Sequence, residues 1–213
     1  MLRKVQFLSL GIAAHFAVAC ACQEDPASAA VGARTSLELV DDDPSNRGSV
    51  AAFRFTSSEG KEVTESDLRG KVWIADFFFT TCSGPCPTIT SQMRLLQDEL
   101  VGSAVQLVSI SVDPQTDTTE VLRDYAARVG ADTARWWFLT GEEAATYDLI
   151  RKSFSLPVER QNDALIGFQV THATRLVVVD GVGNVRGYYP GETPEGRAMA
   201  RTRAQWLARN PGR

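Results

Sequence analysis

Two cysteines in the middle of the chain have the spacing of a reactive or metal-binding pair. Cys82 and Cys86 lie four positions apart, and Pro87 follows the second one directly. Proline suits the first turn of a helix, and the N-terminus of a helix stabilises thiolates through its dipole and its free N–H groups. Both sulfurs can then face one point in space. In an oxidising compartment such a pair is a disulfide, a redox couple or a metal site.

A histidine far along the chain is the candidate third ligand. His172 stands in the segment Val170-Thr171-His172-Ala173, and the other histidine, His15, falls in the N-terminal segment. Two thiolates are soft ligands that suit Cu(I), Zn(II) or an iron–sulfur cluster, and an added imidazole narrows that choice. Cys82, Cys86 and His172 are therefore our predicted metal ligands, provided that the fold brings them together.

The segments around these residues predict strands that alternate with helices. The nearly continuous apolar run at 72–79 fits a strand buried on both faces of a sheet, and apolar residues recur at helical spacing after Pro87. Further strands are predicted over 105–112, 137–140, 175–180 and 185–189, with a first hairpin over 52–63 and helices over 117–129, 140–154 and from 194. Asp117-x-x-Glu120 and Thr140-x-x-Glu143 are predicted capping boxes. Residues 155–168 show no clear period, so we expect an irregular excursion near the site.

This order of elements predicts an α/β fold, a thioredoxin-like three-layer sandwich with an N-terminal β-hairpin extension. Ligands of open α/β sheets gather at the carboxyl ends of the strands, and the cysteine pair follows one such end. In a thioredoxin-like fold, the loop that holds His172 faces the cysteine-bearing turn. A site with two sulfurs and one nitrogen is then within reach.

Two aspartates near the predicted site have more than one interpretation. Asp76 interrupts the apolar run at 72–79, where a carboxylate without a partner would be costly. We expect it to be a buried supporting group rather than a ligand. Asp113 stands before Pro114 at the end of a predicted strand, where it either supports the site or starts a turn.

The N-terminal segment predicts export and a membrane tether. Residues 1–4 are positively charged, and 7–19 are apolar and end in small residues, as in a signal peptide; this run is too short for a convincing spanning helix. Ala17-Val18-Ala19-Cys20 and the overlapping Ala19-Cys20-Ala21-Cys22 resemble a bacterial lipobox, and ordinary cleavage without a lipid is the alternative. We predict a signal peptide and lipobox over 1–22, a flexible linker over 23–47 and the folded domain over 48–213. The protein is then expected on the periplasmic side, anchored to the inner membrane by an N-terminal lipid.

The charge of the chain argues against one class of partner. The 213 residues include 22 basic and 26 acidic side chains, a formal net charge of −4. No basic stripe is present that would neutralise phosphates, so we expect no nucleic-acid partner.

Three segments together resemble the Sco/SenC family over roughly residues 50 to 210. They are Phe77-Phe78-Phe79-Thr80-Thr81-Cys82-Ser83-Gly84-Pro85-Cys86-Pro87, Ser109-Ile110-Ser111-Val112-Asp113-Pro114 and Thr171-His172. The resemblance implies a metallochaperone that binds copper, as Cu(I) or Cu(II), through both cysteines and the histidine. It also implies delivery of copper to the copper A centre of a membrane-bound cytochrome c oxidase subunit, or reduction of that centre's cysteines. A second copper chaperone or a thiol reductase is a further implied partner.

Three other functions compete with copper transfer. A thiol-disulfide oxidoreductase acting on periplasmic disulfides would use Cys82 and Cys86 as its redox-active pair, although three residues separate them instead of the usual two. A peroxidase of the peroxiredoxin kind would need a threonine where Phe79 stands. A zinc site completed by water is chemically sound, but the sequence supplies no general base for a zinc hydrolase.

Overall fold

The structure is a computed structural model that describes residues 48–162, 165 and 167–212. The predicted signal peptide over 1–22 and linker over 23–47 lie outside the described residues and stay predictions. No helix in the described part combines the length and the apolar character needed to cross a membrane.

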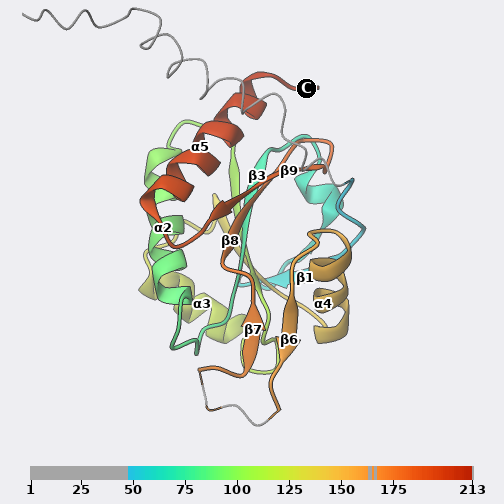
Figure 1. Ribbon diagram of the computed structural model, residues 1–213, viewed down its shortest axis with the longest axis vertical. Helices are drawn as coiled ribbons and strands as arrows, with labels where there is room; N and C mark the ends of the chain where they lie inside the picture. The colour runs from blue at the N-terminus through green and yellow to red at the C-terminus, as the bar shows by residue number, and fades with distance from the viewer. Residues whose placement is uncertain (1–47, 163–164, 166, 213) are drawn as a thin grey trace, which may run out of the picture. The chain divides into compact units, whose positions relative to one another are not determined.

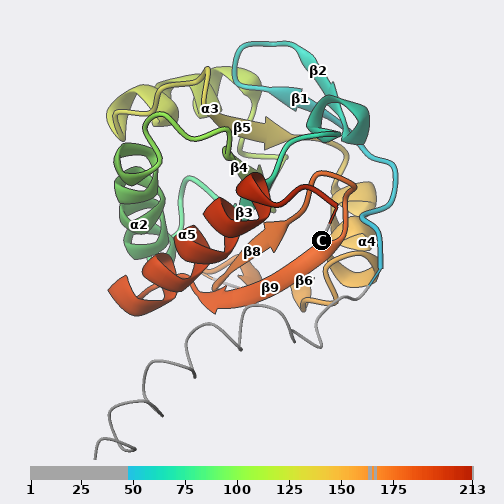
Figure 2. The same cartoon turned by 90° about the horizontal axis from the view of Figure 1, so that it is seen from above.

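Seven strands form one mixed sheet in the order β2-β1-β5-β4-β3-β8-β9 (Figure 1; the strands of this sheet are all labelled in Figure 2). The three central strands β3, β4 and β5 are parallel, and the others pair antiparallel. The strands are β1 (Arg54–Ser57), β2 (Glu62–Thr64), β3 (Trp73–Phe78), β4 (Gln106–Ser111), β5 (Trp136–Thr140), β8 (Arg175–Val179) and β9 (Val185–Pro190). The short 3-10 helix η1 (Glu65–Leu68) follows β2. The predicted N-terminal hairpin is thus confirmed as β1 and β2, which extend one edge of the sheet.

In the described part of the chain, four α-helices cover the two faces of the sheet. They are α2 (Cys86–Glu99), α3 (Thr119–Arg128), α4 (Glu143–Lys152) and α5 (Pro194–Arg209). The connections β3-α2-β4 and β4-α3-β5 step in the same direction across the sheet, so right-handed crossovers place α2 and α3 on one face. Helix α5 packs beside α2, and α4 lies on the opposite face (Figure 2). The predicted three-layer α/β sandwich is confirmed.

Strand β3, which leads to the cysteines, is held from both faces of the sheet. All six of its residues are buried. Phe77 packs edge-on against Phe154 at 5.2 Å between ring centroids, while Phe78 packs against Tyr125 at 5.3 Å on the α3 side. Each buried aromatic side chain contributes about 1.5–3 kcal/mol, so the strand end that precedes Cys82 is strongly fixed.

Both predicted capping boxes, Asp117-x-x-Glu120 and Thr140-x-x-Glu143, are wrong. Helix α3 is capped by Thr118 and α4 by Glu142, whose side-chain oxygens accept hydrogen bonds from backbone N–H groups of the first turn. The two predicted boxes have the right residue types, but each begins before the residue that caps its helix. Asp117 is buried and binds other partners, so it is not available as a cap.

A small second sheet has one of its two strands, β6, within residues 155–168, where the sequence predicted irregular chain. Strands β6 (Val158–Arg160) and β7 (Val170–His172) pair antiparallel and are not part of the seven-stranded sheet. Figure 1 shows them at the lower end of the view, beyond β8. We call these two strands, together with the described residues between them, the β6–β7 hairpin. His172 is the last residue of β7, so this hairpin carries the predicted nitrogen ligand.

Candidate metal centre

The side chains of Cys82, Cys86 and His172 meet in space. One ligand atom from each, the two sulfurs and a ring nitrogen of His172, lies within 4.8 Å of the others, and this is the only such group of three or more potential ligands among the described residues. Nε2 of His172 is 3.4 Å from Sγ of Cys86. Metal–ligand bonds of about 2.0–2.3 Å would separate neighbouring ligands by roughly 3.5–4 Å. The three atoms can therefore enclose one ion after side-chain movements of less than an ångström or so.

The two cysteines occupy different local positions. Cys82 lies in the turn after β3, where its N–H donates to the carbonyl of Phe79. Cys86 is the first residue of α2, and Pro87 occupies the first turn, as the sequence predicted. Cys86 is 1% exposed, whereas Cys82 is half-buried. Neither forms a disulfide, and because Cys82 is the less buried of the two, its sulfur is the one that a second molecule meets first.

The cysteines share one proton unequally. The hydrogen bond from Cys86 is the main cause that lowers the pKa of Cys82, to about 4. The same sharing with Cys82, together with burial, raises the pKa of Cys86. At neutral pH the metal-free pair therefore holds one thiolate, at Cys82, and one thiol, at Cys86.

The ring of His172 is oriented by its other nitrogen. Nδ1 lies 3.1 Å from the carbonyl oxygen of Ala173, to which it donates. A proton on Nδ1 leaves the Nε2 lone pair facing the sulfurs, and a backbone carbonyl often fixes a metal-binding histidine in this way. The ring of Phe79 meets the imidazole edge-on at 5.9 Å. This arrangement presents Nε2 as a ligand before any metal arrives.

Asp113 has both of the roles that the sequence left open. Its backbone carbonyl accepts from the N–H groups of Thr116 and Asp117, which makes the turn. Its side chain is 1% exposed and accepts from Arg160 and Gln169 of the β6–β7 hairpin. Burial raises the pKa of Asp113, but the hydrogen bonds led by Arg160 outweigh it and lower the pKa overall.

Asp117 holds the chain that leads into the cysteine turn. Its carboxylate accepts from the N–H of Thr80 at 3.2 Å and from the hydroxyl of Ser111 at 2.5 Å. Burial raises the pKa of Asp117, and these hydrogen bonds oppose that rise. The sequence offered no signal for this role, because the helix-capping pattern pointed to another function for the same residue.

Asp76 is the buried supporting group that its place in an apolar strand predicted. It is 1% exposed and accepts a hydrogen bond from the hydroxyl of Ser109. That hydroxyl in turn accepts from the indole N–H of Trp136 at 2.8 Å. Burial raises the pKa of Asp76 to about 7, and the Ser109 hydrogen bond only partly opposes this.

A groove of about 580 Å³ adjoins the sulfurs. Both cysteines contribute to its wall, and most of the rest is apolar or uncharged. Its lining is Phe79, Thr80, Cys82, Cys86, Pro87, Thr90, Ser91, Arg94, Leu95, Tyr125 and Val129. The groove gives a second molecule a way to reach Cys82.

Comparisons with known proteins agree with this geometry. Residues 41–207 match the SCO1/SenC family. A SCO1 protein homolog of Bacillus subtilis (strain 168) is 35% identical over 145 residues, which cover 67% of this chain and 74% of that protein.

Solved structures share the fold. One is that of BsSco, described as having a disulfide switch and as a member of the Sco family of cytochrome c oxidase assembly proteins; it is 32% identical, covers 75% of this chain and 96% of its own, and gives a TM-score of 0.63. The structure of Bradyrhizobium japonicum ScoI with copper bound is 22% identical, covers 76% of this chain and 99% of its own, and gives a TM-score of 0.62. With its cysteine pair and histidine brought together on a thioredoxin-like fold, the chain belongs to the SCO1/SenC family.

Proposed function

We propose that this protein binds one copper ion through Cys82, Cys86 and His172 and passes it to the copper A centre of cytochrome c oxidase. The observation that carries the proposal is the convergence of two sulfurs and one imidazole nitrogen within 4.8 Å. Two soft thiolates with an imidazole favour Cu(I) over harder ions. Copper is also the metal bound in the ScoI structure that shares this fold.

The site suits transfer rather than permanent storage. Three protein ligands leave a position open, and the groove beside Cys82 lets a second molecule approach that position. An incoming thiolate can then join the ion before a resident ligand leaves. Such ligand exchange moves the ion without freeing it into solution.

The proposed recipient is a membrane protein, and the proposed tether suits it. BsSco, at 32% identity, is described as one of the cytochrome c oxidase assembly proteins. A lipid on Cys20 or Cys22 and a linker over 23–47 would keep the domain at the outer face of the inner membrane. A flexible linker of about 25 residues gives a typical reach of roughly 25–30 Å, so the domain would stay within range of a membrane-embedded partner.

An anaerobic Cu(I) competition titration tests the copper proposal. The protein is the full chain with Cys20→Ser and Cys22→Ser, so that Cys82 and Cys86 are its only thiols. We expect one equivalent of Cu(I) to bind tightly and each of Cys82→Ser, Cys86→Ser and His172→Ala to weaken binding. Cu(I) affinity that is unchanged in the His172→Ala variant, or no Cu(I) binding at all, would contradict the three-ligand site.

Thiol-disulfide exchange is the second candidate function, favoured by the sulfur chemistry of the metal-free site. A thiolate at Cys82 beside a thiol at Cys86 is the arrangement in which one sulfur attacks and the other resolves the mixed disulfide. In this role the protein would reduce disulfides of periplasmic proteins, among them the oxidised cysteines of the copper A centre. Two measurements test this role: the reduction potential of the Cys82–Cys86 pair and its rate of exchange with a model disulfide. A potential below about −300 mV, typical of structural disulfides, together with negligible exchange would exclude the role.

A further inference from the structure

His172 depends on elements outside the main sheet for its position. It ends β7, which pairs only with β6 among the described strands, so that Val158 lies opposite His172 and Arg160 opposite Val170. The cysteines, in contrast, follow β3 of the main sheet and begin α2. Whatever fixes the β6–β7 hairpin to the rest of the domain therefore sets the distance between the nitrogen and the two sulfurs.

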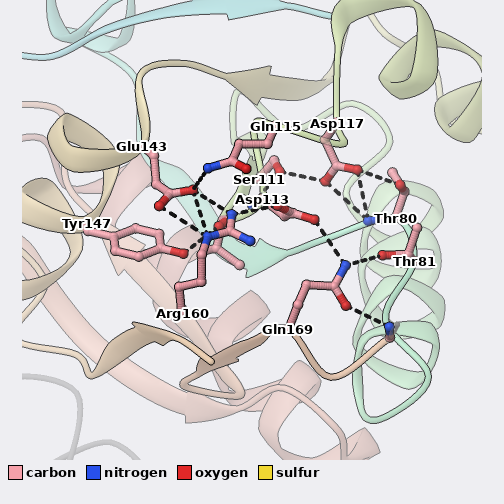
Figure 3. Close-up of polar contacts among 12 residues, drawn as sticks. Thr80, Thr81, Ser111, Asp113, Gln115, Asp117, Glu143, Tyr147, Arg160 and Gln169 are labelled. Atoms are coloured by element: carbon pink, nitrogen blue, oxygen red, sulfur yellow. Dashed lines mark hydrogen bonds and ion pairs between the residues drawn. The ribbon is translucent and has the colours of Figure 1, made fainter. Parts of the chain in front are cut away.

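One buried carboxylate joins both strands of this hairpin to the main domain. Nη2 of Arg160, from β6, lies 2.6 Å from Oδ1 of Asp113. Nε2 of Gln169, the residue before β7, lies 3.1 Å from Oδ2 of Asp113. Each carboxylate oxygen thus accepts from one arm of the hairpin (Figure 3). Arg160 also pairs with Glu143 at the start of α4, where its Nε donates at 3.0 Å.

Gln169 reaches the cysteine turn as well. Its Nε2 donates to the hydroxyl of Thr81 at 2.7 Å, and its Oε1 accepts from the N–H of Gly167 at 2.6 Å. Figure 3 shows the amide of Gln169 between Thr81 and Asp113. Directly beside it, the N–H of Ser83 donates to the carbonyl of Gly167 at 3.1 Å. The residues on either side of Cys82 are therefore tied to the hairpin that carries His172.

These contacts are costly to break one at a time. Asp113 is 1% exposed, so withdrawal of Arg160 would leave a buried carboxylate without its counter-charge. Removing one partner of a buried ion pair destabilises a protein by more than the pair contributes, because an uncompensated charge remains. The docked position of the hairpin is accordingly favoured even without a metal.

We propose that Arg160 and Gln169 are positioning residues for the metal site, because they clamp the β6–β7 hairpin onto Asp113 and so hold His172 opposite Cys82 and Cys86. Neither residue belongs to the candidate ligand group of Cys82, Cys86 and His172. Both act through His172. The part of the inference that concerns affinity rests on the proposed copper site, whereas the docking of the hairpin does not.

A double-mutant cycle separates positioning from general stability. In the full chain with Cys20→Ser and Cys22→Ser, Gln169→Leu and Arg160→Met are each combined with His172→Ala, and Cu(I) affinity is measured by anaerobic competition. We expect each single variant to weaken binding about 10- to 100-fold, as loss of a group that orients a ligand does. In the His172→Ala background both changes should have almost no further effect. Equal losses in the two backgrounds, or no loss in either, would overturn the proposal.

Matched controls lie elsewhere in the domain. Arg186 is partly buried and pairs with the buried Asp180 at 3.2 Å, as Arg160 pairs with Asp113. Gln97 is buried and uses both ends of its amide on the backbone of Gly130 and Asp132. Arg186→Gln and Gln97→Leu should lower unfolding stability while they leave Cu(I) affinity unchanged. Arg160→Lys, which keeps the charge, should recover part of the lost affinity.

Hydrogen exchange on metal-free protein tests the clamp without copper. Arg160→Met and Gln169→Leu should speed exchange of the amides that pair β6 with β7 at least tenfold, with no change in β3 or β4, and the two control variants should not. Unchanged exchange in β6 and β7 would overturn the clamp. If the unmodified site bound no copper, the proposed function would fail, yet this measurement would still decide whether the hairpin is clamped.

Discussion

Nε2 of His172 lies 3.4 Å from Sγ of Cys86, although the two residues are 86 positions apart in the chain. Cys86 is set by the first turn of α2, and His172 by the end of β7. This single distance therefore depends on how well the β6–β7 hairpin docks on the rest of the domain. Changes to the sulfurs, to the buried carboxylates and to the hairpin should therefore have effects that can be measured separately.

The first prediction concerns the reactivity of Cys82 in reduced, metal-free protein. Its pKa is lowered to about 4, chiefly by the hydrogen bond from Cys86. A lowered pKa means that the thiolate is present at pH values above about 4 and is lost below. We expect alkylation of Cys82 by iodoacetamide, followed by mass spectrometry, to be half-maximal near that pH. Cys86→Ala should move the midpoint upward, and a midpoint near about 8.5, the usual value for a free cysteine, would contradict the shared-proton arrangement.

The second prediction concerns the pH dependence of stability. The pKa of Asp76 rises from its ordinary range to about 7 in the folded protein because of burial. The folded protein therefore binds the Asp76 proton more tightly than the unfolded chain does, and this difference stabilises the fold. The stabilisation is complete at acid pH below the unfolded pKa of Asp76 and disappears as pH rises through about 7.

Asp76→Asn removes the titration and should flatten this part of the profile. At about 1.4 kcal/mol per pKa unit, the difference in the free energy of unfolding between wild type and variant should change by a few kcal/mol over that interval. Urea unfolding at a series of pH values measures it. Parallel profiles would show that Asp76 titrates as an exposed carboxyl does.

The third prediction concerns the close approach at Gly167. Its φ of +95° lies in the region that favours glycine, and a Cβ there would lie 3.0 Å from the carbonyl oxygen of Thr81. Gly167→Ala should strain the backbone and also push the hairpin away from the cysteine turn. We expect weaker Cu(I) binding as well as reduced stability.

Gly102 supplies the control for that variant. Its φ of +77° imposes a similar strain, but a Cβ there would meet no atom within 4 Å. Gly102→Ala should cost about 1–2 kcal/mol from backbone conformation alone, as measured by urea unfolding, with Cu(I) affinity unchanged. Equal affinity in the two variants would mean that contact between Gly167 and the turn does not matter for the site.

The fourth prediction concerns metal-linked stability. A ligand that binds only the folded state at about 100 times its Kd adds roughly 2.7 kcal/mol to the free energy of unfolding. Buffered Cu(I) at such an excess should raise the urea midpoint of the wild-type protein accordingly. Cys86→Ala should abolish the rise. A rise that persists in this variant would place the copper elsewhere.

The sheet and the main helices could be predicted from the sequence because they depend on extended patterns of buried residues. The expected fold in turn predicted that Cys82, Cys86 and His172 meet. Strand β3 is apolar throughout, and Pro87 marks the start of α2. Such signals survive an error of one or two positions. The expected excursion at 155–168 was only partly right, because a run as short as β6, three residues long, has too few positions to show a period.

The polar network behind the site could not be predicted from local patterns. Asp117 and Glu120 matched a capping box by spacing alone, but the fold turned Asp117 inward to Thr80 and Ser111. Arg160 lies within the segment expected to be irregular and Gln169 directly follows it, and no local pattern singled out either residue. Their roles depend on Asp113, which lies 47 and 56 positions away. Only the tertiary structure pairs residues at such distances.

The separate β6–β7 hairpin gives the three candidate ligands unequal freedom to leave. Cys86 is the first residue of α2 and is itself only 1% exposed. A backbone movement that withdrew its sulfur from an ion would therefore have to unravel the first turn of this helix. His172 could withdraw together with the two-stranded hairpin, but only after the contacts of Arg160 and Gln169 with Asp113 are broken. If an ion were passed to a partner, the order in which it lost its ligands would therefore depend on how firmly the hairpin is docked as well as on the strengths of the individual bonds.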